Sequence, residues 1–244
     1  MHYRFAPPGS YEDFASGLVL RSAPRYPGFP VRLASELFQR ARLHLGRTRD
    51  LVLWDPCCGS GQLIACLSLL HRESLARVIA SDIDEGAVHL AGHNIALADP
   101  GRLSQRRAAL HELAERFGKP SHARAVEAAD RLASLPGGAP ELTCGVADVL
   151  DPAALAGLLG DATPDIVVTD LPYGEQTGWH GGVSDELPPA ESALRALQAT
   201  IAPDGVAVLV NRGRRPEALS RPREQLRVGR RVAAFYTAGR GGDQ

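Results

Sequence analysis

The sequence predicts an α/β fold in which a mainly parallel sheet is covered by helices on both faces. Three observations lead to this prediction: short apolar runs of strand length, amphipathic stretches of helical period between them, and turn residues at the junctions. Repeated strand–helix units join parallel strands through crossovers. With 244 residues, of which 44% are hydrophobic, the chain is long enough to bury one substantial core.

Helices and strands are expected in a regular order along the chain. An apolar stripe through Leu33, Leu37 and Ala41 predicts a helix behind Pro30, a residue that suits a first helical turn. Buried strands are then predicted at residues 51–54, 78–80, 142–146, 166–168 and 206–210, with helices at 62–70 and 87–95. Residues 226–228 and 232–236 predict a closing hairpin.

Two further predicted helices, at residues 102–117 and 121–135, form an insertion that is longer than a crossover requires. Two interpretations of this insertion remain open: an elaboration of the fold, and a lid that faces the substrate. We expect one domain over residues 1–244, with an N-terminal extension (1–49), the helical insertion (100–138) and an arginine-rich C-terminal segment (211–244).

Composition also limits the environment in which the protein works. No apolar run approaches the roughly 20 residues that a membrane-spanning helix needs, and residues 1–10 lack the basic-then-apolar order of a signal peptide. We therefore expect a cytoplasmic protein. The four cysteines match no zinc-ligand spacing and no disulfide framework, so we expect reduced thiols and no metal.

The charge of the chain is unevenly distributed. Residues 212–231 contain eight arginines and two glutamates, a local balance of +6, which leaves −7 on the rest of a chain whose total is −1. Such a basic segment predicts a polyanionic partner, although arginines on a solvated surface would give the same pattern. Arg212, Arg214 and Arg215 are the candidates for contact with nucleic-acid phosphates.

A glycine loop indicates the class of cofactor. The segment Asp55-Pro-Cys57-Cys-Gly59-Ser-Gly61 follows the first predicted strand and opens a helix. A dinucleotide site requires a third glycine three residues after Gly61, but Ile64 occupies that position. The loop therefore favours a ligand without phosphates, such as S-adenosylmethionine, with Asp55 near its ammonium group, Cys57 lining the loop, and Gly59 and Gly61 close to the ligand.

Two more aspartates follow predicted strands and support the same site. Asp82 ends the second strand, where its carboxylate can accept from both ribose hydroxyls, and Asp148 follows the third strand within reach of the adenine amine. A single aspartate at a strand end can be a helix cap, and Asp151 beside Pro152 is expected to be one. Three at successive strand ends predict a cofactor site.

A second motif, Asp170-Leu171-Pro172-Tyr173-Gly174, predicts the chemistry. The exocyclic amine of a base is a poor nucleophile, so a site that methylates it must hold it in line with the methyl group and accept its hydrogens. Asp170 and the Leu171 carbonyl provide acceptors, Pro172 stiffens the loop, and Tyr173 offers a ring on which the base can stack. These four residues are the catalytic candidates, with Asp170 also expected beside the cofactor.

Aromatic residues on either side of these motifs suggest further contacts. Trp179 lies in a segment with glycines on both sides, as expected of a loop that folds over a flipped base and binds RNA. Phe29 and Arg32 precede or begin the first predicted helix. They are expected to complete the cofactor or base pocket or to belong to the core, and the sequence does not separate these two roles.

The order of these motifs resembles that of class I S-adenosylmethionine methyltransferases. The segment from Asp170 to Tyr173 resembles their Asp/Asn-Pro-Pro-Tyr signature, with Leu171 in place of the first proline. Together with residues 26–34, 54–61 and 116–121, it resembles the avilamycin-resistance methyltransferases of actinomycetes. The resemblance implies a Rossmann-like seven-stranded sheet with one antiparallel strand, S-adenosylmethionine as cofactor, and a helical insertion.

The same resemblance implies a function. The expected reaction is methylation of a guanine, at its exocyclic amine, in 23S rRNA of the large ribosomal subunit, with resistance to orthosomycin antibiotics such as avilamycin as the result. A monomer is expected. The alternatives are a DNA adenine-N6 methyltransferase, a methyltransferase for another structural RNA, a nicotinamide oxidoreductase, and a relative that binds RNA without catalysis.

Overall fold

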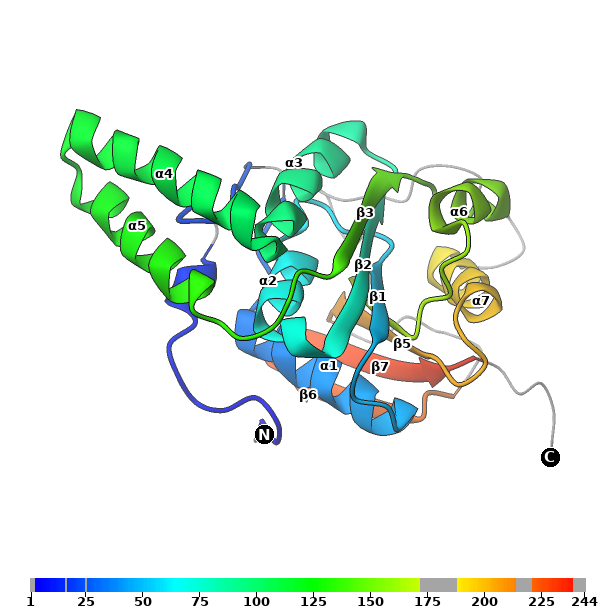
Figure 1. Ribbon diagram of the computed structural model, residues 1–244. Helices are drawn as coiled ribbons and strands as arrows, with labels where there is room; N and C mark the ends of the chain where they lie inside the picture. The colour runs from blue at the N-terminus through cyan, green and yellow to red at the C-terminus, as the bar shows by residue number, and fades with distance from the viewer. Residues whose placement is uncertain (1–2, 16, 25, 172–187, 214–220, 239–244) are drawn as a thin grey trace.

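The computed structural model describes residues 3–15, 17–24, 26–171, 188–213 and 221–238. Its centre is a seven-stranded sheet with the strand order β3-β2-β1-β4-β5-β7-β6 (Figure 1). The strands are β1 (Leu51–Asp55), β2 (Leu75–Asp82), β3 (Glu141–Val146), β4 (Ile166–Asp170), β5 (Val206–Arg212), β6 (Glu224–Val228) and β7 (Arg231–Thr237). Every predicted strand is present, and each is one to five residues longer than predicted.

Strand direction agrees with the expected sheet. Strands β1 to β5 pair in parallel, whereas β7 pairs antiparallel with both β5 and β6. The prediction of one antiparallel strand and of a closing hairpin is therefore confirmed. Chain order leads outward from β1 to β3 and then returns to β4 on the other side of β1. The sheet thus has its topological switch point between β1 and β4, where α/β folds bind ligands.

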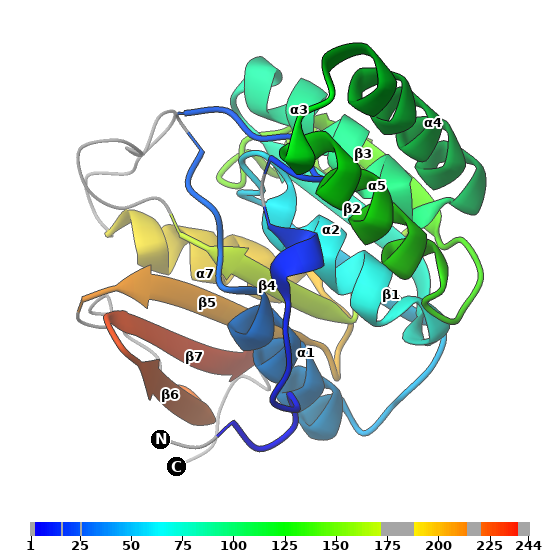
Figure 2. The same ribbon diagram turned by 90° about the vertical axis from the view of Figure 1, so that its left-hand side faces the viewer.

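Helices cover both faces of the sheet, as Figures 1 and 2 show. One face packs against α1, α2 and α3, and the other against α6 and α7. The helices are α1 (Val31–Leu45), α2 (Gln62–Leu70), α3 (Glu85–Ile95), α4 (Pro100–Phe117), α5 (Pro120–Ala133), α6 (Pro152–Leu159) and α7 (Pro189–Thr200), with 3₁₀ turns at Glu12–Phe14, Arg72–Ser74 and Ala96–Ala98. Asp151 caps α6 by accepting from the Ala153 and Ala154 amides, as expected.

The predicted insertion is a pair of helices, α4 and α5, which projects from the sheet beside α2 and α3 (Figure 1). Arg107 forms an ion pair with Asp130 between the two helices. Arg131 of α5 forms an ion pair with Asp13 of the N-terminal segment, at an Nη2–Oδ1 distance of 2.8 Å. The first ion pair joins the two helices of the insertion, and the second joins the insertion to the N-terminal segment.

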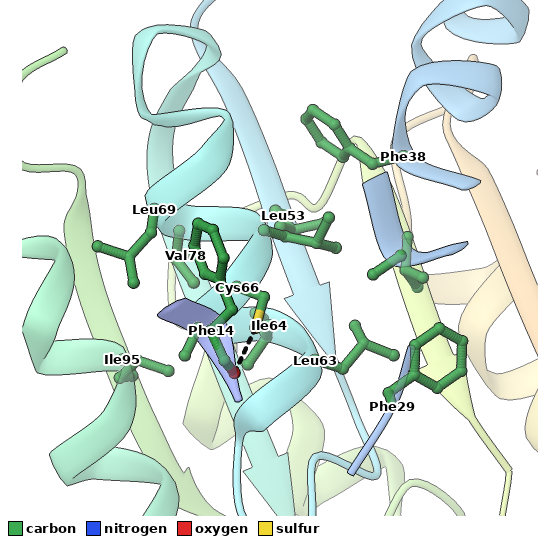
Figure 3. Close-up of a cluster of buried hydrophobic side chains, with 14 of the residues drawn as sticks. Phe14, Phe29, Phe38, Leu53, Leu63, Ile64, Cys66, Leu69, Val78 and Ile95 are labelled. Atoms are coloured by element: carbon green, nitrogen blue, oxygen red, sulfur yellow. Dashed lines mark hydrogen bonds between the residues drawn. The ribbon is translucent and has the colours of Figure 1, made fainter. Parts of the chain in front are cut away.

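Side-chain alternation in the strands divides the core into two halves. Leu53, Val78 and Val168 point to the α1–α2–α3 side, whereas Trp54 and Val167 point to the α6–α7 side. In Figure 3 the first half of the core is seen around α2, with Phe29 beside Leu63 at its edge. In a strand, a residue two positions after one of these core side chains points to the same face of the sheet. This alternation decides which face the aspartates at the strand ends point to.

Two absences among the described residues concern membranes and metals. No helix among them is both long and apolar enough to cross a membrane. In the same residues, no three His, Cys, Asp or Glu side chains are grouped so that they could hold a metal ion.

Candidate active site

Three aspartates stand at the carboxyl edge of the sheet, on the α1–α2–α3 side. Asp55 follows Leu53 by two residues, and the same step links Ala80 to Asp82 and Val168 to Asp170, so alternation turns these carboxylates to one side. Strand register sets their spacing along the edge. Asp55 lies opposite Ala80, so Asp82 is two residues, roughly 7 Å, further along the strand direction. The predicted cofactor residues are therefore brought together.

The glycine loop is a tight turn held by its backbone. The Gly61 amide donates to the Cys58 carbonyl at 2.8 Å, and the Cys58 amide donates to Ser81 of β2 at 2.9 Å. Gly59 and Gly61 have φ values of +52° and +71°, a region that favours glycine. A Cβ on Gly61 would stand 2.8 Å from both Cα and Cβ of Ala91 in α3. Gly61 is thus needed both for the turn and for the close approach of α3.

Asn94 of α3, which the sequence did not single out, fixes the far side of this loop. Its side chain is fully buried in α3. The amide Nδ2 donates to the Ser60 carbonyl at 2.8 Å and to the Arg21 carbonyl at 3.0 Å, and Oδ1 accepts from the Arg21 amide at 2.8 Å. One side chain therefore ties the loop to the N-terminal segment. The sequence does carry a signal for this role, since Asn94 is a polar residue on the apolar side of an amphipathic helix.

Asp82 holds the second turn of the site. Its Oδ2 accepts from the Gly59 amide at 2.8 Å, and its Oδ1 accepts from the Asp84 amide at 3.0 Å. Asp84 in turn caps α3 by accepting from the Ala87 amide at 3.1 Å. Burial raises the pKa of Asp82, although these backbone donors lower it. The carboxylate thus orders the glycine loop and the turn that leads into α3.

Asp55 lies deepest in the site, only 2% exposed. Burial raises its pKa to about 7. The Cys57 amide, which donates at 3.3 Å, lowers it, whereas the charges of Asp82 and Asp170 raise it. A carboxyl that titrates near neutrality among other acids is suited to gain its charge when a cation binds.

The electrostatics around Cys57 show how closely the acids gather. Burial raises the pKa of the Cys57 thiol well above its ordinary value, and nearby carboxylates raise it further. In order of effect these carboxylates are Asp55, Asp82 and Asp148. Asp148 also folds its own turn by accepting from the Leu150 amide at 2.9 Å. Cys57 therefore lines the loop as an un-ionised thiol beside a cluster of negative charge.

Asp170 ends β4 at the entrance to the second motif. Its neighbour Leu171 is buried, and the Leu171 amide donates to the Val210 carbonyl at 2.9 Å, which continues the pairing of β4 with β5. Arg231 of β7 approaches the carboxylate of Asp170, with 3.9 Å between Nη2 and Oδ2. In the sequence Arg231 is only one of eight arginines in a basic segment, because the pairing of β5 with β7 that brings it here is a long-range contact.

Phe29 and Arg32 have different roles. Phe29 is 6% exposed, its amide donates to Oε1 of Gln62 at 2.7 Å, and Arg231 lies over its ring. Arg32 instead donates to the Ala6 carbonyl at 3.2 Å and lies over the Tyr3 ring. Phe29 therefore borders the site, whereas the contacts of Arg32 are with the N-terminal segment.

Several predicted residues lie outside the part of the chain that the structure describes. Pro172, Tyr173 and Trp179 belong to residues 172–187, and Arg214 and Arg215 belong to residues 214–220. Arg212 is described; it ends β5 directly opposite Arg231 of β7. The expected roles of these five undescribed residues stay predictions.

The raised pKa of Asp55 predicts how stability depends on pH. An aspartate in the unfolded chain has a pKa of about 3.9, so between about pH 4 and pH 7 the folded chain binds the extra proton and the free energy of unfolding falls as pH rises. We expect Asp55→Asn to remove this loss. The melting temperature of the variant minus that of the wild type should therefore increase between pH 5 and pH 8. Thermal melts across this range check the difference.

The pH profile of the variant must be compared with that of the wild type, because a second group, His71, changes the free energy of unfolding with pH in the opposite direction. Burial lowers the pKa of His71 to about 4, so its contribution to stability is lost as pH falls below about 6.5. This contribution is common to both proteins and cancels in the difference. Parallel pH profiles of the two proteins would contradict the assignment.

The chain matches known proteins over nearly its whole length. A model of the family described as "rRNA methyltransferase AviRa" matches residues 1–231. A curated relative from Streptomyces viridochromogenes, a "23S rRNA (guanine(2535)-N(1))-methyltransferase", is 46% identical over 230 residues, which cover 93% of this chain and 91% of the relative.

Solved structures agree with this match. Two crystal structures of the rRNA methyltransferase AviRa from Streptomyces viridochromogenes, at 1.5 and 2.4 Å, each superpose with a TM-score of 0.89 at 44% identity, covering 98% of this chain and 97% of the other. The α/β fold with its mixed seven-stranded sheet is that of these methyltransferases. The chain belongs to the AviRa family of rRNA methyltransferases.

Proposed function

We propose that this protein transfers a methyl group from S-adenosylmethionine to N1 of a guanine in 23S rRNA. The observation that carries this proposal is the row of strand-end acids, which ends with Asp170, the first residue of the second motif, and lies at the switch point of the sheet. Family membership and the curated relative, which methylates N1 of a 23S rRNA guanine, support the same reaction.

The acidic cluster fits the proposed cofactor. S-adenosylmethionine carries a sulfonium and an ammonium, so a site rich in carboxylates favours it over a ligand with a pyrophosphate. Asp55 would face the ammonium, Asp82 the ribose hydroxyls, and Asp148 the adenine amine, with Gly59 and Gly61 giving the ligand room. When bound, the cofactor supplies an electrophilic methyl group.

The curated relative methylates N1 of its guanine, so we propose N1 as the target atom in place of the exocyclic amine. In neutral guanine N1 carries a hydrogen and has no free lone pair, so N1 must lose this proton to accept a methyl group. Asp170 can accept the N1 proton, and the Leu171 carbonyl can accept from the adjacent amino group. The acceptors that the sequence predicted for an amine therefore also suit N1 of guanine.

The same proposal covers the cellular role. We propose that the protein acts as a monomer in the cytoplasm on 23S rRNA of the large ribosomal subunit, and that the methyl group confers resistance to orthosomycin antibiotics such as avilamycin. Arg212, with Arg214 and Arg215, would contact phosphates. The match to a family of rRNA enzymes favours this substrate over the DNA alternative.

Transfer of labelled methyl groups tests the reaction. The purified protein and labelled S-adenosylmethionine are incubated with unmodified 23S rRNA, large ribosomal subunits, small-subunit rRNA and DNA, and the labelled RNA is digested to nucleosides. We expect label in 23S rRNA as 1-methylguanosine. Label as N2-methylguanosine would restore the exocyclic amine as target. Label only on DNA, or no label despite measured cofactor binding, would overturn the substrate.

A further inference from the structure

Arg231, the first residue of β7, faces Asp170 across the edge of the sheet. The distance from Nη2 to Oδ2 is 3.9 Å, and the two side chains are 16% and 24% exposed. At this separation the interaction is electrostatic rather than a hydrogen bond. Because both groups are largely removed from water, the attraction is less screened than between charges on an open surface.

The guanidinium of Arg231 is held by an aromatic platform. It lies 5.0 Å from the centre of the Phe29 ring, a separation at which a cation is attracted to the face of the ring. Phe29 is anchored in turn, since its amide donates to Oε1 of Gln62 in the first turn of α2. The position of Arg231 is therefore tied to the helix that the glycine loop opens.

Strand pairing places a second positive charge next to this one. Arg212 of β5 lies directly opposite Arg231, and like charges at such positions destabilise a sheet. Asp170 of β4 pairs with Val210, two residues before Arg212, so its carboxylate lies on the same side at the adjacent strand. The negative charge of Asp170 offsets part of the repulsion between the two arginines.

Arg231 also has a donor that the protein does not use. Considering only the residues that the structure describes, its Nε is buried and has no hydrogen-bond partner. Buried donors are almost always satisfied, and exceptions are often found at functional sites. Arg42 and Arg72 also carry such donors in the described residues, so the role of Arg231 rests on its charge and its contacts with Asp170 and Phe29.

We propose that Arg231 is a positioning residue for methyl transfer: it holds the Asp170 carboxylate in its charged form and directs it toward the base. This inference rests on the proposed function. The acids at Asp55 and Asp82 disfavour a further negative charge at this edge of the sheet, and the guanidinium of Arg231 opposes their effect. Only the charged carboxylate can accept the N1 proton.

A double-mutant cycle tests whether Arg231 acts through Asp170. Arg231→Ala, Arg231→Lys, Asp170→Asn and the double variants are compared with wild type by single-turnover methylation of 23S rRNA. We expect Arg231→Ala to lower the rate by about 10- to 100-fold, the scale of losses from a misplaced reacting group. The affinity for S-adenosylmethionine should stay near that of wild type. In the Asp170→Asn background, removal of Arg231 should have almost no further effect.

Two further variants separate positioning from folding and charge. Arg231→Lys keeps the positive charge without the planar group that lies on Phe29, so we expect partial recovery of the rate. Arg77→Ala is the matched control, because it removes an arginine that pairs with Glu141 and Asp161 away from the site. It should keep the wild-type rate. Melting temperatures and cofactor affinity confirm that each variant is folded.

Three outcomes would overturn the inference. These are an unchanged rate in Arg231→Ala, an equal loss in the wild-type and Asp170→Asn backgrounds, and a change confined to the RNA concentration needed for half-maximal rate. The last outcome would make Arg231 a phosphate contact. If wild type itself transferred no methyl group to 23S rRNA, the proposed function would fail first, so the two failures are distinct.

Discussion

Asp170→Asn is expected to lower the rate of methyl transfer to 23S rRNA by roughly 10²- to 10⁴-fold, the usual contribution of a group that accepts a proton during reaction. Asparagine keeps the size of the side chain but carries no negative charge and cannot take the N1 proton. The backbone on both sides of Asp170 is fixed by the pairing of β4 with β5 and by the hydrogen bond from the Leu171 amide to the Val210 carbonyl. The variant should therefore fold.

The control for Asp170→Asn is the same replacement at an exposed aspartate. Asp161 has a side chain that is 92% exposed and pairs only with Arg77 in the described structure, so Asp161→Asn should methylate at the wild-type rate. Label transfer measures the rate, and calorimetry of S-adenosylmethionine binding shows whether the cofactor site is intact. An Asp170→Asn protein that binds cofactor and keeps more than about a tenth of the wild-type rate would contradict the role of Asp170.

The sequence predicted the parts of the fold that depend on local patterns. Strand β1, the glycine turn and helix α2 follow one another within twenty residues, and hydrophobic periodicity marks each of them. The edge of the sheet could also be predicted, because parallel strands bring their carboxyl ends together. This rule grouped Asp55, Asp82 and Asp148, which follow successive strands, and Asp170 was expected beside them; all four act on Asp55 or Cys57 in the structure.

Features that depend on contacts between distant segments were not predicted. Asn94 ties the glycine loop to Arg21, and Arg231 reaches Asp170, although these partners are separated by 73 and 61 residues in the sequence. Helices α6 and α7 were not predicted individually. Helix α6, Pro152–Leu159, is apolar around most of its surface and lacks a clear periodic pattern. Local propensity carries no information on which buried polar groups will meet.

Gly61→Ala is expected to destabilise the fold by about 3 kcal/mol or more, from two separate causes. A residue with a side chain in the left-handed region costs about 1–2 kcal/mol, and the φ of Gly61 is +71°. The new Cβ would also stand 2.8 Å from Cα and Cβ of Ala91, closer than such atoms can approach. Separation of α3 from the loop would relieve the contact, at a cost typical of overpacking, about 1–3 kcal/mol.

Gly46→Ala separates these two causes. Gly46 ends α1 with a φ of +76°, nearly that of Gly61, yet a Cβ there would meet no atom within 4 Å. Its replacement should lower the free energy of unfolding only by the cost of placing alanine in the left-handed region, about 1–2 kcal/mol. Urea unfolding of both variants gives the difference directly. Because Asn94 and Ala91 both lie on α3, displacement of this helix should also weaken cofactor binding in Gly61→Ala but not in Gly46→Ala. Equal losses of stability in the two variants would mean that the loop and α3 move apart at little cost to make room for the extra methyl group. The close contact between Gly61 and Ala91 would then contribute nothing to the order of the site.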